Sequence, residues 1–386
     1  MKRSTEKILT THAGSLPRPA DLLELIRARE TGQPYDPSAL ADRVRSAVAE
    51  VVARQVDTGL DVVSDGEQGK PGFANYVRDR LTGLINREGV PPRVSSDVVD
   101  FPDFEPLDNA ALNTRRVICA GPIAWKDKTD LHNDIENFRA AVQEAQPIEA
   151  FMPAVSPGTL AQNVINEHYK DEKEFLFAVA EVMKEEYQAI TQGGLLLQID
   201  SPDLAMGWHT QFPDKSLEEF RQIISRRVEA LNLALEGIPP EQVRHHICWG
   251  NGERPHHRDA QLKDIVDVIL RARVGATYVE GANPRHGHEW KVFREVKLPQ
   301  GMVLIAGVID TKTNIIEHPE LVADRIMNYA SVVGRENILA GTDCGFGTSA
   351  DRTRVAPSIA WAKLQSLAEG ARLASQQLWG RANFGA

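Results

Sequence analysis

The 386-residue sequence has few cysteines, no long hydrophobic run and no excess of positive charge. Three cysteines cannot build a disulfide framework, and their small, odd number fits a reducing compartment. The longest apolar stretch, around residues 302–309, is far too short to span a bilayer, and no apolar segment of a secretory signal follows the basic N-terminus. The net charge of −10 argues against non-specific nucleic-acid binding. We therefore expect a cytoplasmic protein that binds neither membranes nor nucleic acids.

The sequence also lacks GxGxxG and GxxxxGK[ST], so a nucleotide-binding doubly wound sheet loses its best signature. It does contain short apolar runs that alternate with longer segments of helical periodicity. Nearly continuous runs of this kind are typical of parallel strands that are buried on both faces. The runs cover residues 8–15, 60–67, 115–123, 149–157, 193–202, 243–250, 277–283, 302–310 and 337–345. Repeated βα units of this number predict an α/β fold, specifically a (β/α)8 TIM barrel.

Nine strand candidates for eight barrel positions imply that one run lies outside the barrel. We expect an N-terminal extension and a loop or hairpin insertion near residues 92–123, and one domain over residues 1–386. Four helices are expected to begin at Asp36-Pro37, to cover Glu172 to Gln192, to start near Ser216 with a capping box, and to run from Pro357 to Leu378.

Polar and ionisable residues gather at the ends of the apolar runs. Because active-site groups of a (β/α)8 barrel lie at the C-terminal ends of its strands, we expect a functional site there. The residues at these ends are His12, Ser15, Asp65, Glu67, Asp200, Asp203, His246, Cys248, Glu280, Asp310, Lys312, Asp343 and Cys344.

Two of these run ends share one chemistry. The spacing of two residues places His246 and Cys248 on one face of a strand, and Cys344 lies in a Gly-rich turn at another strand end. One imidazole and two thiolates suit Zn²⁺, and Glu280 would complete a tetrahedron. The alternatives are buried structural cysteines, and a Glu280 that caps a helix or pairs with Arg285.

Other histidines and the remaining cysteine fit this site less well. His286 and His288 form a competing H-x-H site, but no thiolate stands beside them. The neighbours His256 and His257 lie in a polar segment, where we expect them to be solvated. Cys119 has no such partner and is expected to be a small core residue.

Seven motifs in order resemble one known family. They are AGSLPRP (13–19), SDGEQG (64–69), QIDSPD (198–203), HICWG (246–250), VEGAN (279–283), GVIDTK (307–312) and TDCGFG (342–347). Together they resemble the catalytic barrel of cobalamin-independent methionine synthase, in the short form that lacks that enzyme's N-terminal half. The same superfamily includes the epoxyalkane:coenzyme M transferases and, more distantly, the uroporphyrinogen decarboxylase-like barrels.

The resemblance implies roles for individual residues. The zinc ligands would be His246, Cys248, Glu280 and Cys344, and the contacts to an acceptor amino acid would be Gly14, Ser15, Glu67 and Asp200. For Glu67 the alternative is an ion pair with Lys70, and for Asp200 a structural acceptor next to Pro202.

The sequence departs from the family pattern at two points. Where the family has Asp-x-His, with the histidine as proton donor, this chain has Asp310-Thr311-Lys312, and the family's Asp-Glu-Pro is Asp200-Ser201-Pro202 here. Methyltetrahydrofolate is a poor donor unless its N5 is protonated, so the missing acid argues against folate. Lys312 and Asp310 remain candidate catalytic residues. The alternatives for Lys312 are a pair with Asp310 and a contact to an anionic group.

Further residues are candidates for the pocket wall, with packing or helix-surface roles as the alternative. They are His12, Arg18, Asn163, His168, Tyr169, Trp208 and His209. The sequence thus predicts zinc-dependent transfer of a methyl or other alkyl group to a small-molecule thiol. Alternatives are epoxide opening by a non-amino-acid thiol and a catalytically inactive zinc-binding barrel. Whether the chain forms a homo-oligomer stays open.

Overall fold

The computed structural model describes residues 1–90, 95–104, 116–350 and 354–380. Eight strands form one sheet in the order β1-β11-β10-β9-β8-β7-β5-β2, and every pair in it is parallel. The strands are β1 (Leu9–Thr10), β2 (Val62–Val63), β5 (Glu149–Val155), β7 (Leu196–Asp200), β8 (Val243–Ile247), β9 (Ala276–Val279), β10 (Val303–Ile309) and β11 (Ile338–Thr342).

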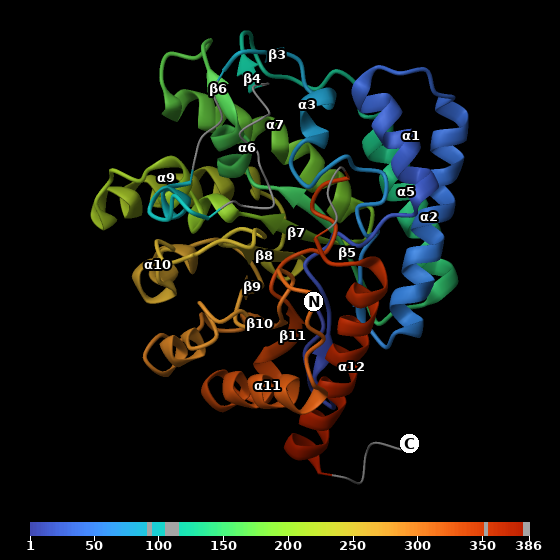
Figure 1. Ribbon diagram of the computed structural model, residues 1–386, viewed down its shortest axis with the longest axis vertical. Coiled ribbons are helices and arrows are strands. Elements are labelled where there is room, and N and C mark those ends of the chain that lie inside the picture. The colour runs from blue at the N-terminus through green and yellow to red at the C-terminus, as the bar shows by residue number, and fades with distance from the viewer. Residues whose placement is uncertain (91–94, 105–115, 351–353, 381–386) are drawn as a thin grey trace.

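The two edge strands of this sheet approach each other. The backbone N–H of Asp61 donates to the carbonyl of Thr10 at 3.2 Å, and the hydroxyl of Thr11 donates to the carbonyl of Val62 at 3.1 Å. These bonds bring the sheet round to a nearly closed barrel that helices surround (Figure 1). The predicted (β/α)8 barrel is confirmed. Strands β8, β10 and β11 are buried at every residue, as parallel strands covered on both faces require.

Helices connect the strands and cover the barrel. The α-helices are α1 (Ala20–Thr31), α2 (Pro37–Asp57), α3 (Tyr76–Arg80), α4 (Ser96–Val99), α5 (Thr129–Ala145), α6 (Pro157–Asn163), α7 (Glu172–Gln192), α8 (Gly207–Gln211), α9 (Leu217–Ala234), α10 (Leu262–Ile269), α11 (Pro319–Val333) and α12 (Pro357–Trp379). Short 3₁₀ helices are η2 (Pro202–Leu204), η3 (Pro240–Gln242), η4 (Glu289–Arg294) and η5 (Arg335–Asn337).

The four helices expected from the sequence are present, and the N-terminal caps predicted for two of them are formed. The Asp36 side chain accepts from the N–H of Ser38 at 2.8 Å at the start of α2. Ser216 and Glu219 form the reciprocal capping box of α9.

The ninth apolar run lies outside the barrel. Strand β4 (Arg116–Cys119) pairs antiparallel with β3 (Leu84–Arg87) and parallel with β6 (Val164–Asn166). This small sheet lies at the top of Figure 1, on the side away from α11 and α12. The insertion is confirmed, although its first strand begins before residue 92. Residues 91–94 and 105–115 of the predicted insertion lie outside the described residues.

Residues 1–8 precede the first barrel strand and form the expected N-terminal extension. The amino group of Met1 donates to the carbonyl of Glu241 at 2.9 Å and lies 3.6 Å from the carboxylate of Glu149. The extension therefore runs along the N-terminal ends of β8 and β5. Among the described residues, no helix has both the length and the apolar character needed to span a membrane.

Candidate metal centre and substrate cavity

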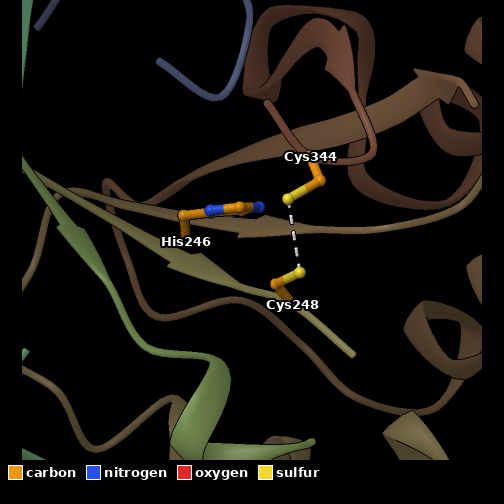
Figure 2. Close-up of side chains that lie close together, drawn as sticks. All are labelled: His246, Cys248 and Cys344. Carbon is orange, nitrogen blue, oxygen red and sulfur yellow. Dashed lines mark hydrogen bonds between the residues drawn. The ribbon is translucent and has the colours of Figure 1, made fainter. Parts of the chain in front are cut away.

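Three predicted metal ligands meet at the C-terminal ends of β8 and β11. His246 lies in β8, Cys248 follows that strand directly, and Cys344 follows β11. Their donor atoms all lie within 4.8 Å of one another, and all three residues are buried. The two sulfur atoms are 3.5 Å apart, with the imidazole pointing toward them (Figure 2).

Asp200 at the end of β7 orients the imidazole. Nδ1 of His246 lies 3.0 Å from a carboxylate oxygen of Asp200, and Nε2 lies 3.2 Å from the carbonyl oxygen of Asp343. Burial alone lowers the pKa of His246, but the hydrogen bond to Asp200 and its charge outweigh burial and raise it. A proton held on Nδ1 by the carboxylate leaves Nε2 as the atom that can bind a metal once it has lost its own proton.

The two thiols share one hydrogen bond. The thiol of Cys248 donates to the sulfur of Cys344. This bond raises the pKa of Cys248 and lowers that of Cys344, and the neighbouring His246 favours the Cys344 thiolate further. The two thiols are therefore not equivalent, and Cys344 is the one that ionises more readily.

The geometry of this group fits Zn²⁺. Tetrahedral zinc with Zn–S bonds of about 2.3 Å holds two sulfurs about 3.8 Å apart. The observed 3.5 Å is close to that value. A set of one imidazole and two thiolates also favours Zn²⁺ over Mg²⁺ or Ca²⁺, which bind oxygen ligands instead.

Glu280, the predicted fourth ligand, is not part of this group. Its carboxylate accepts from the ammonium of Lys312 at 2.7 Å, the amide of Asn283 at 2.7 Å and the N–H of Trp249 at 2.9 Å. Burial raises the pKa of Glu280, but the charge of Lys312 outweighs it and lowers the pKa overall. Neither the helix-cap alternative nor the pair with Arg285 describes these contacts.

A cavity of about 180 Å³ opens beside the metal ligands. Of the predicted site residues, Ser15, Glu67, Asp200, His209, His246, Cys248 and Cys344 line it. Its other walls include Phe73, Met206, Trp249, Arg254, His256, Thr348 and Arg354. The structure thus brings together side chains from the ends of five strands, β1, β2, β7, β8 and β11.

Glu67 lies on the cavity wall in a strained conformation. It has a φ of 55°, only 2% of its surface is exposed, and its Oε2 has no hydrogen-bond partner among the described residues. Burial, reinforced by the charge of Asp200, raises its pKa to about 8, although Lys70 opposes the change. A side chain at Gly14 would meet the ring of Pro153 at 2.8 Å and Oε1 of Glu67 at 3.3 Å, so glycine leaves room for this carboxylate.

The predicted alternative for Glu67, an ion pair with Lys70, is not among the ion pairs of the described residues. Lys70 donates instead to the carbonyl of Pro153 at 2.6 Å. Arg18 donates to the carbonyls of Glu67, Lys70 and Gly347 at 2.7–3.1 Å. Arg18 therefore holds the turn that carries Glu67, and it does not line the cavity.

The other predicted pocket residues are scattered. Nε2 of His12 lies 2.7 Å from the amide oxygen of Gln55, inside the protein. Asn163 and His168 are exposed, and Tyr169 receives a hydrogen bond from Ile123 beside the small sheet. Trp208 stacks on Phe220. Asp310 and Lys312 are buried and do not line the cavity either.

A buried group that the sequence reasoning missed surrounds Asp259. Its carboxylate lies 2.8 Å from Nδ1 of His256 and 2.9 Å from Nε2 of His286, whose Nδ1 lies 2.8 Å from Glu289. His209 faces the other oxygen at 3.1 Å, but the angle does not make a hydrogen bond. His256 is thus buried, not solvated as predicted, because Asp259 compensates its polarity. The H-x-x-D and H-x-x-E spacings were the available signal.

Arg254 is a further cavity residue that the sequence reasoning missed. Its Nε is buried and has no hydrogen-bond partner in the part of the chain that the structure describes. Buried donors without a partner are uncommon in native proteins.

Comparisons with known proteins agree with this geometry. The family model "Cobalamin-independent synthase, Catalytic domain" matches residues 154–363, more than half of the chain. The methionine synthase of Thermococcus kodakarensis is 24% identical over 376 residues, covering 96% of this chain and 94% of its own. The 2-hydroxypropyl-CoM lyase of Xanthobacter autotrophicus is 25% identical, covering 96% of both chains. A B12-independent methionine synthase structure from a Shewanella species, in complex with selenomethionine, superposes with a TM-score of 0.74 at 19% identity, covering 96% of this chain and 99% of its own.

Proposed function

The chain belongs to the family of cobalamin-independent synthase catalytic domains, and we propose that it transfers a methyl or other alkyl group to a small-molecule thiol as one zinc-binding domain. The observation that carries this proposal is the convergence of His246, Cys248 and Cys344 on the wall of a substrate-sized cavity. The family relatives support the reaction class, and the ligand set supports the metal.

His246, Cys248 and Cys344 would hold Zn²⁺. When bound, the ion would supply a Lewis acid that keeps an acceptor thiol deprotonated at neutral pH. The chain's own residues prepare this site, because Asp200 fixes the orientation of the imidazole.

The proposed reaction exchanges one bond for another. The acceptor's sulfur forms a bond to the alkyl carbon, while that carbon's bond to the leaving atom of the donor breaks. The thiol proton is released to solvent before attack, and the leaving atom of the donor takes up the electron pair of the broken bond. The cavity holds both substrates at reacting distance, which replaces an encounter in solution.

An amino-acid thiol such as homocysteine is the acceptor that we favour. Glu67 and Asp200 both line the cavity and offer carboxylates to an α-ammonium group, and Ser15 lines it from the end of β1. The unsatisfied oxygen of Glu67 supports this assignment, because a ligand N–H would give it the partner that it lacks.

A second candidate is alkyl transfer to an anionic thiol that is not an amino acid, as in epoxide opening. The unpartnered Nε of Arg254 in the cavity favours it, and 2-hydroxypropyl-CoM lyase is a relative. Lys312 lends this candidate no support, because it pairs with Glu280 and does not line the cavity.

A panel of thiols tests both candidates. Zinc-quantified protein is incubated with homocysteine, 2-mercaptoethanesulfonate or 2-mercaptoethanol, together with methyl and epoxide donors, and alkylated products are measured by mass spectrometry. Product from homocysteine alone supports the first candidate, and product from the sulfonate alone supports the second. No alkylated thiol from any combination would leave the inactive zinc-binding barrel as the better description.

Cysteine variants provide the matched control. Cys344→Ala should abolish zinc retention and turnover, because it removes one of three ligands. Cys119→Ala should retain both, because Cys119 lies in β4 of the small sheet, outside the barrel. Full turnover by metal-free Cys344→Ala protein would refute the proposed function.

A further inference from the structure

The imidazole of His209 reaches the wall of the cavity without a hydrogen-bond partner. His209 lies in α8, only 3% of its surface is exposed, and it lines the cavity that the metal ligands also line. Neither of its ring nitrogens makes a hydrogen bond with a described residue. Buried polar groups normally have partners, so this open imidazole requires an explanation. The inference drawn from it concerns the alkyl transfer of the proposed function and rests on that function.

A carboxylate stands behind this imidazole. Nδ1 of His209 lies 3.1 Å from Oδ1 of Asp259, but the angle between them falls short of a hydrogen bond. Oδ2 of the same carboxylate is held by Nδ1 of His256 at 2.8 Å and by Nε2 of His286 at 2.9 Å. Hydrogen bonds of catalytic groups are often poorly aligned before substrate binds and tighten in the complex. A small turn of the His209 ring would align Nδ1–H with Oδ1 and leave Nε2 to act in the cavity.

The two other histidines of the described cavity wall have partners or a different role. Nδ1 of His256 contacts the Asp259 carboxylate, and its Nε2 lies 2.8 Å from the carbonyl oxygen of Gly252. His246 is a metal ligand in the proposed function. His209 is therefore the imidazole of this wall that is free to exchange a proton with a substrate.

Alkyl transfer to a thiol requires a proton at some leaving atoms. The electron pair of the broken bond stays on the leaving atom, which becomes an alkoxide when an epoxide opens. An alkoxide is strongly basic, so an acid that protonates it in the transition state lowers the barrier. The leaving atom lies beyond the alkyl carbon, in line with the attacking sulfur, so the acid must stand away from the sulfur ligands. His209 meets this condition, because it belongs to α8 whereas the two cysteines follow β8 and β11.

We propose that His209 is a catalytic residue that donates the proton on Nε2 to the leaving atom of the alkyl donor, while Asp259 positions its ring. The N–H bond of the imidazolium breaks as the bond between the proton and the leaving atom forms. The ring returns to its neutral form and keeps the proton on Nδ1, which faces Asp259. Solvent then supplies the next proton, which balances the thiol proton released to solvent. The donor class is one whose leaving atom needs a proton, such as an epoxide oxygen or an amine nitrogen.

The charges around the imidazole give this acid a defined pH dependence. Burial lowers the pKa of His209, the carboxylates of Asp259 and Asp97 oppose that change, and the charges of His256 and Arg254 add to it. The acid form is lost as pH rises through the pKa of the ring. The rate with a donor that needs a proton should therefore fall with rising pH, relative to the rate with a donor that needs none.

Two donors that differ in their leaving atom test the proposal. Zinc-quantified protein and the thiol that the panel above identifies are incubated with epoxypropane, whose oxygen needs a proton, or with iodomethane, whose iodide needs none. His209→Gln should lower kcat about 100-fold with epoxypropane and less than about threefold with iodomethane. The ratio of the epoxypropane rate to the iodomethane rate should fall as pH rises in the unaltered protein and stay constant in the variant. A merely structural role would lower both rates together.

Further variants control this comparison. Asp259→Asn removes a charge that raises the pKa of His209, so the fall of the rate ratio should move to lower pH. His132→Gln is the matched control, because His132 is exposed on α5 and its replacement should change neither rate. Zinc content and circular dichroism establish that each variant is loaded and folded. If His209→Gln does not fold, rates of the unaltered protein in D₂O keep the proposal testable: D₂O should slow the epoxypropane reaction more than the iodomethane reaction, since a proton moves only in the former.

Three results would overturn the inference. Equal losses with both donors in folded, zinc-loaded His209→Gln would mean that His209 shapes the cavity without donating a proton. Equal slowing of both reactions in D₂O would mean that no proton moves with the leaving atom. A loss confined to epoxypropane in Glu67→Gln, with none in His209→Gln, would assign the proton to Glu67. Absence of product from the unaltered protein with every donor is a different outcome, and it would refute the proposed function itself.

Discussion

Replacing Glu67 with glutamine should stabilise the protein at neutral and alkaline pH while weakening its binding of an amine-bearing thiol. The folded protein holds this carboxyl group buried, with one oxygen lacking a partner. Its pKa is about 8 in the fold, against an ordinary value of 4.5. Glutamine has nearly the same shape and cannot ionise, so the substitution changes the charge with little effect on packing.

The size of the effect follows from linkage. Between pH 4.5 and 8 the unfolded chain has lost the Glu67 proton and the folded protein has kept it. Unfolding therefore releases a proton and becomes more favourable as pH rises, so the free energy of unfolding falls by about 1.4 kcal/mol per pH unit. The stability present below pH 4.5 is lost as pH approaches 8. From pH 5 to 8 the wild-type protein should therefore lose about 4 kcal/mol relative to Glu67→Gln.

Urea unfolding at pH 5, 6, 7 and 8, followed by circular dichroism, measures this difference. All other titrating groups occur in both proteins and cancel when the two curves are subtracted. Glu24→Gln, at an exposed position on α1, controls for the loss of a carboxylate as such. Parallel stability curves for wild type and Glu67→Gln would show that the Glu67 carboxyl ionises normally in the fold and would refute the reasoning.

Ligand binding provides the functional arm of the same prediction. An α-ammonium group binds the ionised form of Glu67, and that form increases about tenfold from pH 6 to 7 when the pKa is 8. The ratio of wild-type to Glu67→Gln affinity for homocysteine should therefore rise by nearly that factor, because titration of the thiol itself cancels in the ratio. A ratio that does not change with pH would place the ammonium group elsewhere.

Three further substitutions should have distinct outcomes. Asp259→Asn removes the counter-charge of a buried imidazolium, so urea unfolding should show a loss of about 3–5 kcal/mol, and a loss below about 1 kcal/mol would contradict the charged pairing. Gly158→Ala would place a methyl group against the buried carboxylate of Asp203, so its melting temperature should fall, whereas Gly121→Ala meets only one atom, at 3.6 Å, and should leave it unchanged. Arg254→Met should raise KM about tenfold for 2-mercaptoethanesulfonate and leave KM for 2-mercaptoethanol unaltered; equal changes for both thiols would mean that Arg254 binds no anion.

The barrel could be predicted from the sequence because its strands are buried on both faces. Seven of the eight barrel strands lie within one of the nine apolar runs, and β9 begins one residue before its run, since strands covered on both sides are rich in apolar residues. The run at 115–123 has the same composition, yet β4 pairs with β3 and β6 instead. Local composition predicts that a segment is a strand, but not which strands it pairs with. The insertion was therefore indicated only by the count of nine apolar runs for eight barrel positions.

The candidate site could be predicted in part. His246, Cys248 and Cys344 were found because their ligand types are rare and occur at strand ends. The partner of Glu280 was not found, because Lys312 lies 32 residues away and only the adjacency of β9 and β10 in the barrel brings the two together. Position at a strand end predicts that a residue is near the site. It does not predict whether a neighbour has already satisfied that residue.

That distinction separates the ionisable groups of the barrel mouth into two kinds. Glu280, Asp343 and Arg18 are buried, and hydrogen bonds and ion pairs supply their partners within the chain, so they hold loops in place. Glu67 is equally buried but has an unsatisfied oxygen at the cavity, and it carries backbone strain as well. A folded chain gains nothing from an unsatisfied buried carboxylate unless a ligand supplies the missing partner. Replacing the unpaired Glu67 should therefore lower activity and raise stability. Replacing one of the paired groups should lower both activity and stability.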